Sequence, residues 1–391
     1  MTTTSRQAEG FTAGRREFLG AMGATLVGAS TAVSRPARAA GDSILLGQSA
    51  ALSGPAAELG QQFKLGANML FDRLNAQGGV GGRLIELRSL DDGYDKDRCI
   101  ENTRRLIADG AVALFGYVGT TTSLAALPLV SESSRIFFAP FTGSEALRIP
   151  FNPLVFHVRS SYVDETHAIV KHLTSVGIKR IGVFFQNDGD GKAGLLGVTR
   201  ALKLQYQAPT GIGFVEPKSI DVANAVAAIL APRPDAIVQV SAYGPSAAFI
   251  HAARRAGFQG VFYNTSFVGA QALARELGGD ASGVVVSQVM PFPFSPLTRV
   301  VGDYLAAGRQ LHGDTFAPSY GSIEGYLAAK TLAEGLRRAG RNLSAAGIAT
   351  GLESLHALDL GGFNVDFGPN RHVASHYIDL TMLTDDGRVR A

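Results

Sequence analysis

Short apolar runs alternate with amphipathic segments along the first part of the chain. Ile44–Gly47, Leu84–Leu90 and Val112–Phe115 each have the length and apolar content of a strand. Between the first two runs, the apolar residues from Phe63 to Leu74 recur at i, i+4, i+7, i+8 and i+11, which places them on one face of a helix. Helices between such strands require a parallel sheet covered on both faces, so the pattern predicts a doubly wound unit.

The alternation restarts after Pro150 and Pro153 and predicts a second unit of the same kind. Beyond Pro291, Pro293 and Pro296, long helices follow without an equal number of strands, so they must pack on one of the two sheets. The fold class is therefore predicted to be α/β, with two doubly wound Rossmann-like lobes. The expected elements after Pro153 are the strands Arg180–Phe185, Gly211–Val215, Ala236–Val240, Val261–Tyr263 and Val284–Gln288, the long helices Pro296–Leu311 and Ser319–Ala339, and two final strands, Gly361–Asp366 and Tyr377–Leu383.

Two loops rich in hydroxyl groups follow neighbouring strands of the first unit. Thr120–Ser123 comes after Val112–Phe115, and Thr142–Ser144 comes after Ile136–Phe138. Because the carboxyl ends of parallel strands meet at one edge of a sheet, both loops are expected to lie together, each with free backbone N–H groups at a helix N-terminus. Two such loops suit a small anion, although Ser and Thr are also the ordinary N-cap residues.

The N-terminal segment has the pattern of an export signal. Arg15–Leu19 (RREFL) is a twin-arginine motif, a mildly apolar run continues to Val33, and Ala37–Ala39 is a small-x-small cleavage site. A signal peptide is therefore predicted at residues 1–39, followed by a periplasmic mature chain that begins at Ala40. This segment carries a net charge of +3 and so does the whole chain, so the mature protein is formally neutral and nucleic-acid binding has no support.

Composition allows two domains and argues against thiol or metal chemistry. The chain has 391 residues, 46% of them hydrophobic and 18% charged, as in an ordinary globular protein. Cys99 is the only cysteine, which excludes an intrachain disulfide and a thiolate metal cluster; a buried thiol on a helix is expected. His167 and His172 are too far apart on one predicted helix to share a metal ion. No metal site is expected.

The segment Gly189–Gly194 (GDGKAG) is the sharpest enzymatic motif. It matches G-x-G-x-x-G, follows a predicted strand and opens a predicted helix, and Glu216 ends the next strand where a ribose-binding acid would lie. A periplasmic NAD(P)-dependent oxidoreductase is therefore the alternative function. An ordinary strand-to-helix loop explains the same residues, because Asn187 and Asp188 separate the glycines from the strand.

Tyr162, Asp190 and Tyr243 each lie at a predicted strand end of the second unit. Aromatic side chains there could cover an apolar part of a ligand across a cleft between the lobes. Tyrosine is also common at the rims of clefts, so no single one of these residues defines a site.

Several longer stretches match one known family in their order and spacing. They are ALSGPAAELGQQFKLGANMLFDRLNAQGGVGGRLIEL, LDDGYD, GYVGTTTS, the Phe-x-x-Arg run Phe156–Arg159 with SSYVDE, SAYGPSAAFI and SIEGYLAAK. On these stretches the mature chain resembles the type I periplasmic binding proteins of the branched-chain amino-acid (leucine/isoleucine/valine) family. The resemblance implies two Rossmann-like lobes joined by three crossovers, closing on a solute that is passed to the inner-membrane permease subunits of an ABC importer. It implies no catalytic residue and no cofactor.

By this resemblance, loops of the first lobe hold the carboxylate end of the ligand and the second lobe closes over it. Two positions depart from the family: Ser266 stands where leucine binders carry an acid for the α-ammonium, and Tyr94 and Gly119 replace a cysteine pair. Asp190 is the nearby substitute for the missing acid. The resemblance implies as ligand-binding residues Ser53, Thr120, Thr121, Thr142 and Ser144 from the first lobe, with Tyr162 and Tyr243 from the second. Gly143, Asp190 and Ser266 complete the set of candidate ligand-binding residues.

The crossovers set the expected lobe boundaries. They are expected near Pro150–Arg159, Gln288–Pro293 and Asn370. Lobe 1 is then predicted to comprise residues 42–157 plus 292–370, and lobe 2 residues 158–291 plus 371–391. The expected solute is a small carboxylate: a branched-chain or related amino acid is preferred to an aliphatic or aromatic acid without an amino group.

Overall fold

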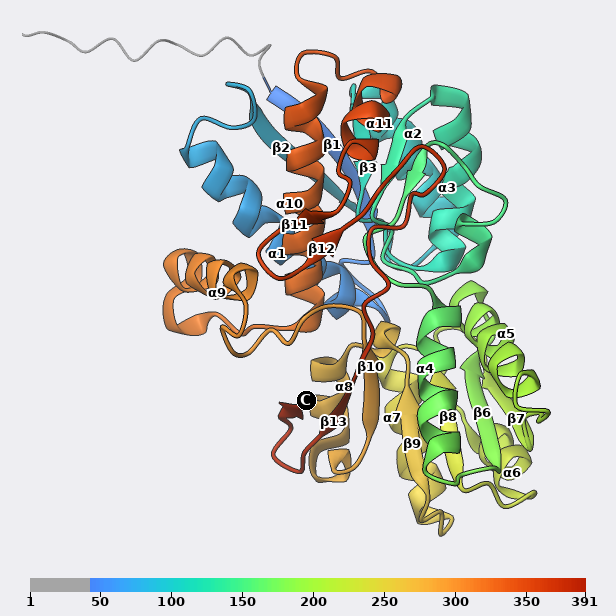
Figure 1. Ribbon diagram of the computed structural model, residues 1–391. Helices are drawn as coiled ribbons and strands as arrows, with labels where there is room; N and C mark the ends of the chain where they lie inside the picture. The colour runs from blue at the N-terminus through green and yellow to red at the C-terminus, as the bar shows by residue number, and fades with distance from the viewer. Residues whose placement is uncertain (1–42) are drawn as a thin grey trace, which may run out of the picture. The chain divides into compact units, whose positions relative to one another are not determined.

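The computed structural model describes residues 43–391, so the predicted signal peptide lies outside the described residues. A five-stranded sheet forms the centre of one lobe, which we call lobe 1 (Figure 1). Its strands pair in parallel in the order β2-β1-β3-β4-β5, which confirms the predicted parallel sheet. The strands are β1 (Ser43–Ala50), β2 (Leu84–Asp91), β3 (Ala113–Phe115), β4 (Ile136–Phe138) and β5 (Val155–Phe156).

A seven-stranded sheet, in the order β14-β13-β10-β9-β8-β6-β7, forms the centre of lobe 2. Strands β6 to β10 are parallel, as predicted, whereas β13 pairs antiparallel with β10 because the chain re-enters this lobe from the opposite direction (Figure 1). The strands are β6 (Ile181–Gln186), β7 (Gly211–Val215), β8 (Ala236–Val240), β9 (Val261–Asn264), β10 (Val285–Gln288), β13 (Asp379–Leu383) and β14 (Val389–Arg390).

The strand expected at Gly361–Asp366 is wrong in its extent. Gly361 and Gly362 have positive φ angles of 104° and 98°, a backbone conformation that residues with a side chain rarely adopt, and they form a turn instead of a strand. The turn joins two short strands that pair with each other, β11 (Leu358–Asp359) and β12 (Asn364–Val365).

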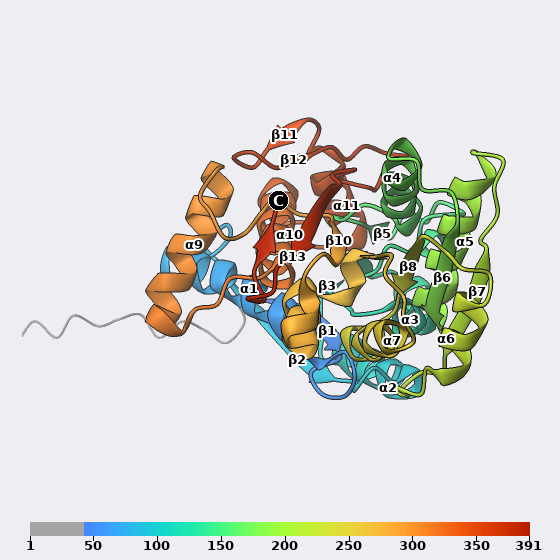
Figure 2. The same cartoon turned by 90° about the horizontal axis from the view of Figure 1, so that it is seen from below.

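The long C-terminal helices pack on lobe 1, which confirms that they build no third sheet. Helix α10 lies against α1 and between α9 and α11 (Figure 2). Glycines permit the close approach of α1 and α10, since a Cβ at Gly66 would lie 1.7 Å from the Ser322 carbonyl oxygen. The helices of this lobe are α1 (Ala57–Ala76), α2 (Lys96–Ala108), α3 (Thr120–Ser133), the short η1 (Glu145–Leu147), α9 (Arg299–His312), η4 (Gly313–Thr315), α10 (Tyr320–Ala339) and α11 (Ala345–Glu353).

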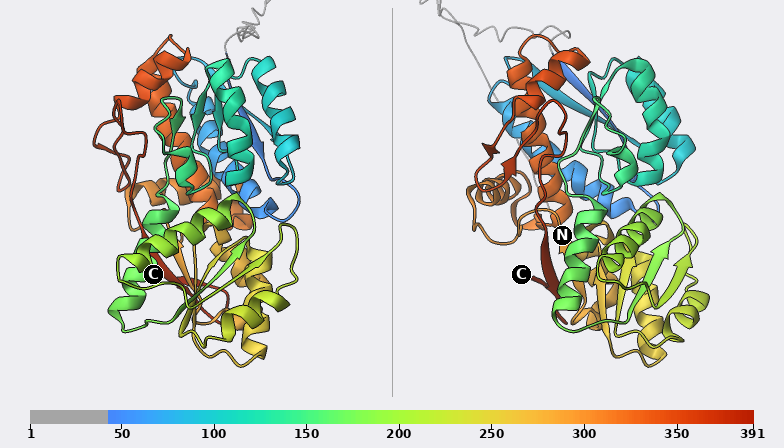
Figure 3. Two further views of the ribbon diagram at one scale, coloured as in Figure 1. Left: turned by 90° about the vertical axis from the view of Figure 1, so that its right-hand side faces the viewer. Right: turned by 45° about the vertical axis from the view of Figure 1, so that its right-hand side comes forward.

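Three segments connect the lobes, as predicted: β5 to α4, β10 to α9, and β12 to β13. The first and third run side by side (Figure 3), because the His157 N–H donates to the His372 carbonyl at 2.7 Å and the Ala374 N–H donates to the His157 carbonyl at 2.8 Å.

No helix in residues 43–391 has the length and apolarity needed to span a bilayer. The helices of lobe 2 are α4 (Tyr162–Ser175), α5 (Gly189–Lys203), α6 (Ala223–Leu230), α7 (Tyr243–Arg255), η2 (Ser266–Val268), α8 (Ala270–Leu277) and η3 (Gly278–Ala281).

Candidate functional site

The two hydroxyl-rich loops of lobe 1 meet at the carboxyl edge of its sheet. One loop leaves β3 and starts α3 at Thr120, and the other leaves β4 and carries Thr142. The hydroxyl oxygens of Thr120 and Thr142 are 2.6 Å apart, and the Ser144 N–H donates to the Thr142 hydroxyl at 3.2 Å. Both threonines are buried. The sequence-based placement of these loops at one edge is therefore confirmed.

The Asp190 carboxylate of lobe 2 occupies the meeting point of these loops. It accepts hydrogen bonds from the Thr120 N–H at 2.7 Å and the Thr120 hydroxyl at 2.7 Å. The Tyr94 and Tyr162 hydroxyls each donate to it at 2.8 Å, and the Thr142 hydroxyl lies at 3.2 Å. Asp190 is only 1% exposed, and all of its hydrogen-bond donors among residues 43–391 are uncharged. Four of these five donor groups belong to lobe 1.

The tyrosines around this carboxylate remain protonated donors. Burial, followed by the charge of Asp190, raises the pKa of Tyr94 and of Tyr162 well above the ordinary value. Asp188 lies beside them and accepts from Tyr94 at 3.1 Å. Burial, and then the neighbouring Asp190 charge, raise the pKa of Asp188 to about 6. The cluster thus contains one carboxylate that is strongly hydrogen-bonded and a second that is costly to ionise.

Two glycines let the lobes approach at this point. The Tyr162 N–H donates to the Gly143 carbonyl at 2.7 Å, and a Cβ at Gly143 would lie 2.6 Å from that nitrogen. The Gly189 N–H donates to the Thr121 hydroxyl at 3.1 Å, and a Cβ at Gly189 would lie 2.9 Å from the Thr120 methyl group. Larger residues at either glycine would force the lobes apart.

A second buried cluster is centred on Arg159, at the first crossover. Its guanidinium donates to the Ser266 hydroxyl at 2.5 Å, pairs with Glu324 of α10 at 3.4 Å and lies 4.3 Å from the centre of the Phe141 ring. Glu165 of α4 accepts from the Ser266 N–H at 2.7 Å and from the Ser266 hydroxyl at 2.9 Å. The pKa of Glu324 is about 7, raised by burial and only partly lowered by Arg159. Ser266 is therefore engaged by this chain's own charged groups.

Apolar side chains fill the space beside the two clusters. The Phe267 ring of η2 lies 6.4 Å from the Tyr94 ring and 6.3 Å from the Phe141 ring, so a lobe 2 residue packs between two residues of lobe 1. A cavity of about 20 Å³ remains next to Phe141, Arg159 and Ser266. That volume has room for about a single water molecule and not for an amino acid.

Three other residues that the resemblance implies, Ser53, Ser144 and Tyr243, do not donate to the Asp190 carboxylate among the described residues. Ser53 is exposed and donates to the Asp91 carboxylate at 2.6 Å, and in the described part of the chain no hydrogen bond joins it to Asp190. Ser144 is buried and caps η1 by accepting from the Ala146 N–H at 3.3 Å. Tyr243 begins α7, half-buried, without a hydrogen bond to the Asp190 cluster among the described residues.

The G-x-G-x-x-G segment does begin a helix, as predicted, but its surroundings do not suit a pyrophosphate. Asp188 caps α5 by accepting from the Gly191 N–H at 3.0 Å. The first turn thus presents the carboxylates of Asp188 and Asp190, and Thr121 bonds the Gly189 N–H. Two carboxylates repel an anion at this end, so the nucleotide alternative has no supporting site here.

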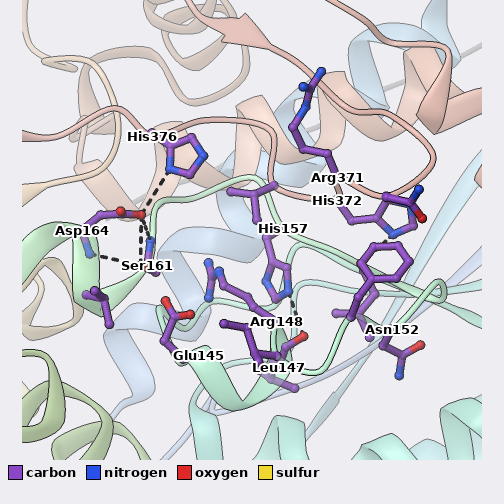
Figure 4. A pocket seen from close by; sticks show the side chains of 16 residues that line it. Glu145, Leu147, Arg148, Asn152, His157, Ser161, Asp164, Arg371, His372 and His376 are labelled. Carbon is purple, nitrogen blue, oxygen red and sulfur yellow. Dashed lines mark hydrogen bonds and ion pairs between the residues drawn. The ribbon is translucent and has the colours of Figure 1, made fainter.

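A separate cavity of about 490 Å³ lies where the first and third crossovers run together (Figure 4). His157 is buried in its wall, and its Nε2–H donates to the Leu147 carbonyl at 3.2 Å. Burial, and then the charge of Arg148, lower the pKa of His157 and keep the ring neutral. His376 and Asp164 pair at 3.3 Å across its mouth, as Figure 4 shows.

Cys99 is buried on α2, as predicted. Among residues 43–391, no cluster of His, Cys, Asp and Glu is arranged to hold a metal ion.

Sequence reasoning missed the partners that complete both clusters. From the sequence, Tyr94 is identifiable only as a replacement for a cysteine, and no pattern predicts the roles of Asp188 and Glu165. Glu324 had a usable signal: it is a lone acid in the otherwise uncharged run Ser319–Ala329 of a long helix, a pattern typical of a buried, paired carboxylate. The other three are polar residues at element ends and carry no such signal.

Comparison with known proteins agrees with this architecture. A family model described as periplasmic binding protein matches residues 43–388. A possible leucine/isoleucine/valine-binding protein from Rhodopirellula baltica SH 1 is 35% identical over 90% of this chain and 97% of that one, with a TM-score of 0.85. A substrate-binding periplasmic protein from Ralstonia solanacearum is 32% identical over 88% of this chain and 99% of that one, with a TM-score of 0.83.

A fatty acid ABC transporter substrate-binding protein from Thermomonospora curvata shares the fold, with a TM-score of 0.81 at 19% identity over 89% of this chain and 91% of that one. No protein with a curated description matches the chain. The match over nearly all described residues, together with two α/β lobes joined by three crossovers, shows that the chain belongs to the type I periplasmic binding protein family.

Proposed function

We propose that this protein is the periplasmic solute-binding component of an ABC importer, and that its solute is a small α-amino acid, branched-chain or related, captured between the lobes. Export by the twin-arginine pathway and delivery to inner-membrane permease subunits belong to the same proposal. The Rhodopirellula baltica relative, described as a possible leucine/isoleucine/valine-binding protein, supports this solute class.

The observation that carries the proposal is the set of uncharged donors around Asp190. The Thr120 N–H and hydroxyl and the Thr142 and Tyr94 hydroxyls all belong to lobe 1, and all lie within hydrogen-bond distance of one carboxylate. When the lobes separate, these four donors lose Asp190 and form a vacant anion site. Charge-assisted hydrogen bonds are worth about 1.5–3 kcal/mol each, so a solute carboxylate is a fitting occupant.

The position of Asp190 favours a solute that also carries an ammonium group. Asp190 reaches the lobe 1 donors in the closed arrangement, so a solute carboxylate on those donors would lie close to it once the lobes close again. Two buried carboxylates in contact repel each other unless a cation separates them. An α-ammonium next to the α-carboxylate supplies that cation. Asp190 thus takes the role of the acid that is missing at Ser266.

Calorimetry with leucine and with 4-methyl-2-oxopentanoate tests this proposal, after a thermal-shift screen has identified the best amino acid. The amino acid should bind more tightly than its 2-oxo acid, and Asp190→Asn should weaken amino-acid binding by roughly 30-fold, since breaking a buried charge pair costs about 2–5 kcal/mol. Equal affinity of the wild type and Asp190→Asn for the amino acid would contradict the assigned role of Asp190. Binding of oxo acids alone would contradict the amino-acid class.

A further inference from the structure

Lobe 2 places two of its own side chains where a solute would be bound. The Asp190 carboxylate sits on the donors of Thr120, Tyr94 and Thr142, and Phe267 packs between Tyr94 and Phe141. A carboxylate and an apolar side chain are also the two parts of an apolar amino acid that such a cleft has to accommodate.

We propose that Asp190 and Phe267 act together as an internal mimic of the solute, which holds the lobes closed until a solute displaces it. The mimic defines what the solute has to replace, and in this respect the inference rests on the proposed function. Closure by the mimic itself needs no solute and can be tested without one.

The closed arrangement buries the side chains of the Asp190 cluster together with Phe267. Thr120, Thr142, Tyr162 and Asp190 are at most 1% exposed and Phe267 is fully buried. At the rim, Lys218 of lobe 2 pairs with Asp95 of lobe 1 at 3.7 Å, and Arg275 pairs with Glu58. A solute cannot reach the lobe 1 donors in this arrangement, so it must bind when the lobes are apart.

Competition of this kind lowers the apparent affinity for the solute. If the self-closed form outnumbers the open form by about ten to one, the apparent dissociation constant rises about tenfold. Removing the Asp190 carboxylate should therefore have opposite effects on two solutes. The affinity for a 2-oxo acid should rise, because the variant lacks both the competing carboxylate and the charge that repels the acid. The affinity for an amino acid should fall, because its ammonium group loses the Asp190 carboxylate as a partner.

Small-angle scattering of the mature protein without solute tests self-closure directly. Wild type should be compact, Asp190→Asn intermediate and Asp190→Ala expanded, because Asn keeps the shape but loses the charge. Asp72→Ala is the control, since Asp72 is an exposed acid on α1 of lobe 1. Circular dichroism melts verify that each variant is folded. A wild type as expanded as Asp190→Ala, or an Asp190→Ala variant as compact as wild type, would overturn self-closure.

A binding experiment tests the competition. The affinity of 4-methyl-2-oxopentanoate should rise at least about tenfold in Asp190→Ala and stay unchanged in Asp72→Ala. No gain in Asp190→Ala would overturn the shared use of the lobe 1 donors. The two experiments separate this inference from the proposed function: if scattering shows self-closure but no carboxylate solute binds any variant, closure by Asp190 stands, whereas its mimicry of the solute and the solute assignment both fail.

Discussion

Two clusters of buried carboxylates lie where the lobes meet, and they differ in what compensates the charge. Asp190 is held by hydroxyl and backbone N–H donors, with no cation bonded to it among residues 43–391. Glu324 instead pairs with the guanidinium of Arg159 at 3.4 Å, and Glu165 accepts from the Ser266 hydroxyl to which that guanidinium donates. Uncharged donors accept any carboxylate of suitable shape, whereas a buried cation with two acids is a fixed arrangement. The first cluster is therefore suited to exchange and the second to structure.

The origin of the partners supports this distinction. Four of the five donors to Asp190 belong to the opposite lobe, so lobe opening breaks most of its bonds. Glu165, in contrast, accepts from Ser266 and Ser287 within its own lobe, at 2.9 and 2.5 Å from their hydroxyls, although Arg159 also reaches lobe 1 through Glu324 and Phe141. Substitutions in the two clusters should therefore separate binding from stability.

The largest expected effect is on stability, from Arg159→Met. Removing the guanidinium leaves Glu165 and Glu324 buried without their cation, which should lower the free energy of unfolding by about 3–5 kcal/mol in chemical denaturation. The matched control is Arg180→Met, because Arg180 pairs with Asp235 at 2.5 Å on the surface and such a pair is worth about 0–1 kcal/mol. Equal losses in the two variants would contradict a structural role for the Arg159 cluster.

The next largest effect is on binding, from the double substitution Thr120→Ala with Thr142→Ala. Losing two charge-assisted bonds of about 2 kcal/mol each should lower the affinity roughly a thousandfold. The same substitutions weaken the competing Asp190 contact, which should raise the affinity about tenfold. We therefore expect the affinity for the amino-acid solute to fall about a hundredfold by calorimetry, with little change in stability.

The same double substitution has an internal control in Thr121→Ala, whose hydroxyl accepts from the Gly189 N–H and does not contact Asp190. Thr121→Ala should retain affinity within a few-fold. Near-wild-type affinity in the double variant would remove the carboxylate site from these two loops.

The comparison also shows what a single sequence can reveal. Thr120 and Thr142 were found because hydroxyls after successive parallel strands must meet at one sheet edge. The role of Asp190 depends on how far lobe 2 closes, and no local pattern encodes that distance. The strand expected at Tyr377–Leu383 is present as β13, but no local pattern predicts its antiparallel pairing with β10, since that partner lies about 90 residues earlier in the chain.

A smaller effect, on the pH dependence of stability, is expected from Asp188→Asn. The folded pKa of Asp188 is about 6, above its ordinary value of 3.8, so the folded state binds the proton more tightly than the unfolded state. Its contribution to stability is therefore fully present below about pH 4 and is lost as the pH rises through about 6. Asparagine keeps the α5 cap without this charge. The free energy of unfolding of the variant should therefore exceed that of wild type by on the order of 2 kcal/mol at pH 7 and be the same at pH 4.

Denaturation of wild type and Asp188→Asn at both pH values measures this difference. Asp221→Asn, at an exposed position of the same lobe, controls for the loss of one negative charge and should change stability equally at both pH values. A gain at pH 7 that persists at pH 4 would mean that Asp188 acts through packing and not through its charge.

The smallest effect is expected from Tyr94→Phe, and its size tests the mimic most finely. The ring stays against Phe267, so packing is kept, and only the hydroxyl that donates to Asp190 is lost. A solute carboxylate on the same donors loses one bond of about 2 kcal/mol, roughly 30-fold in affinity, but the internal competitor loses the same bond. Because relief of competition returns about tenfold, the net loss of affinity should be only about threefold, while scattering of the solute-free variant shows partial opening. A full 30-fold loss of affinity would mean that Asp190 does not compete with the solute, and the two roles assigned to this carboxylate would have to be separated.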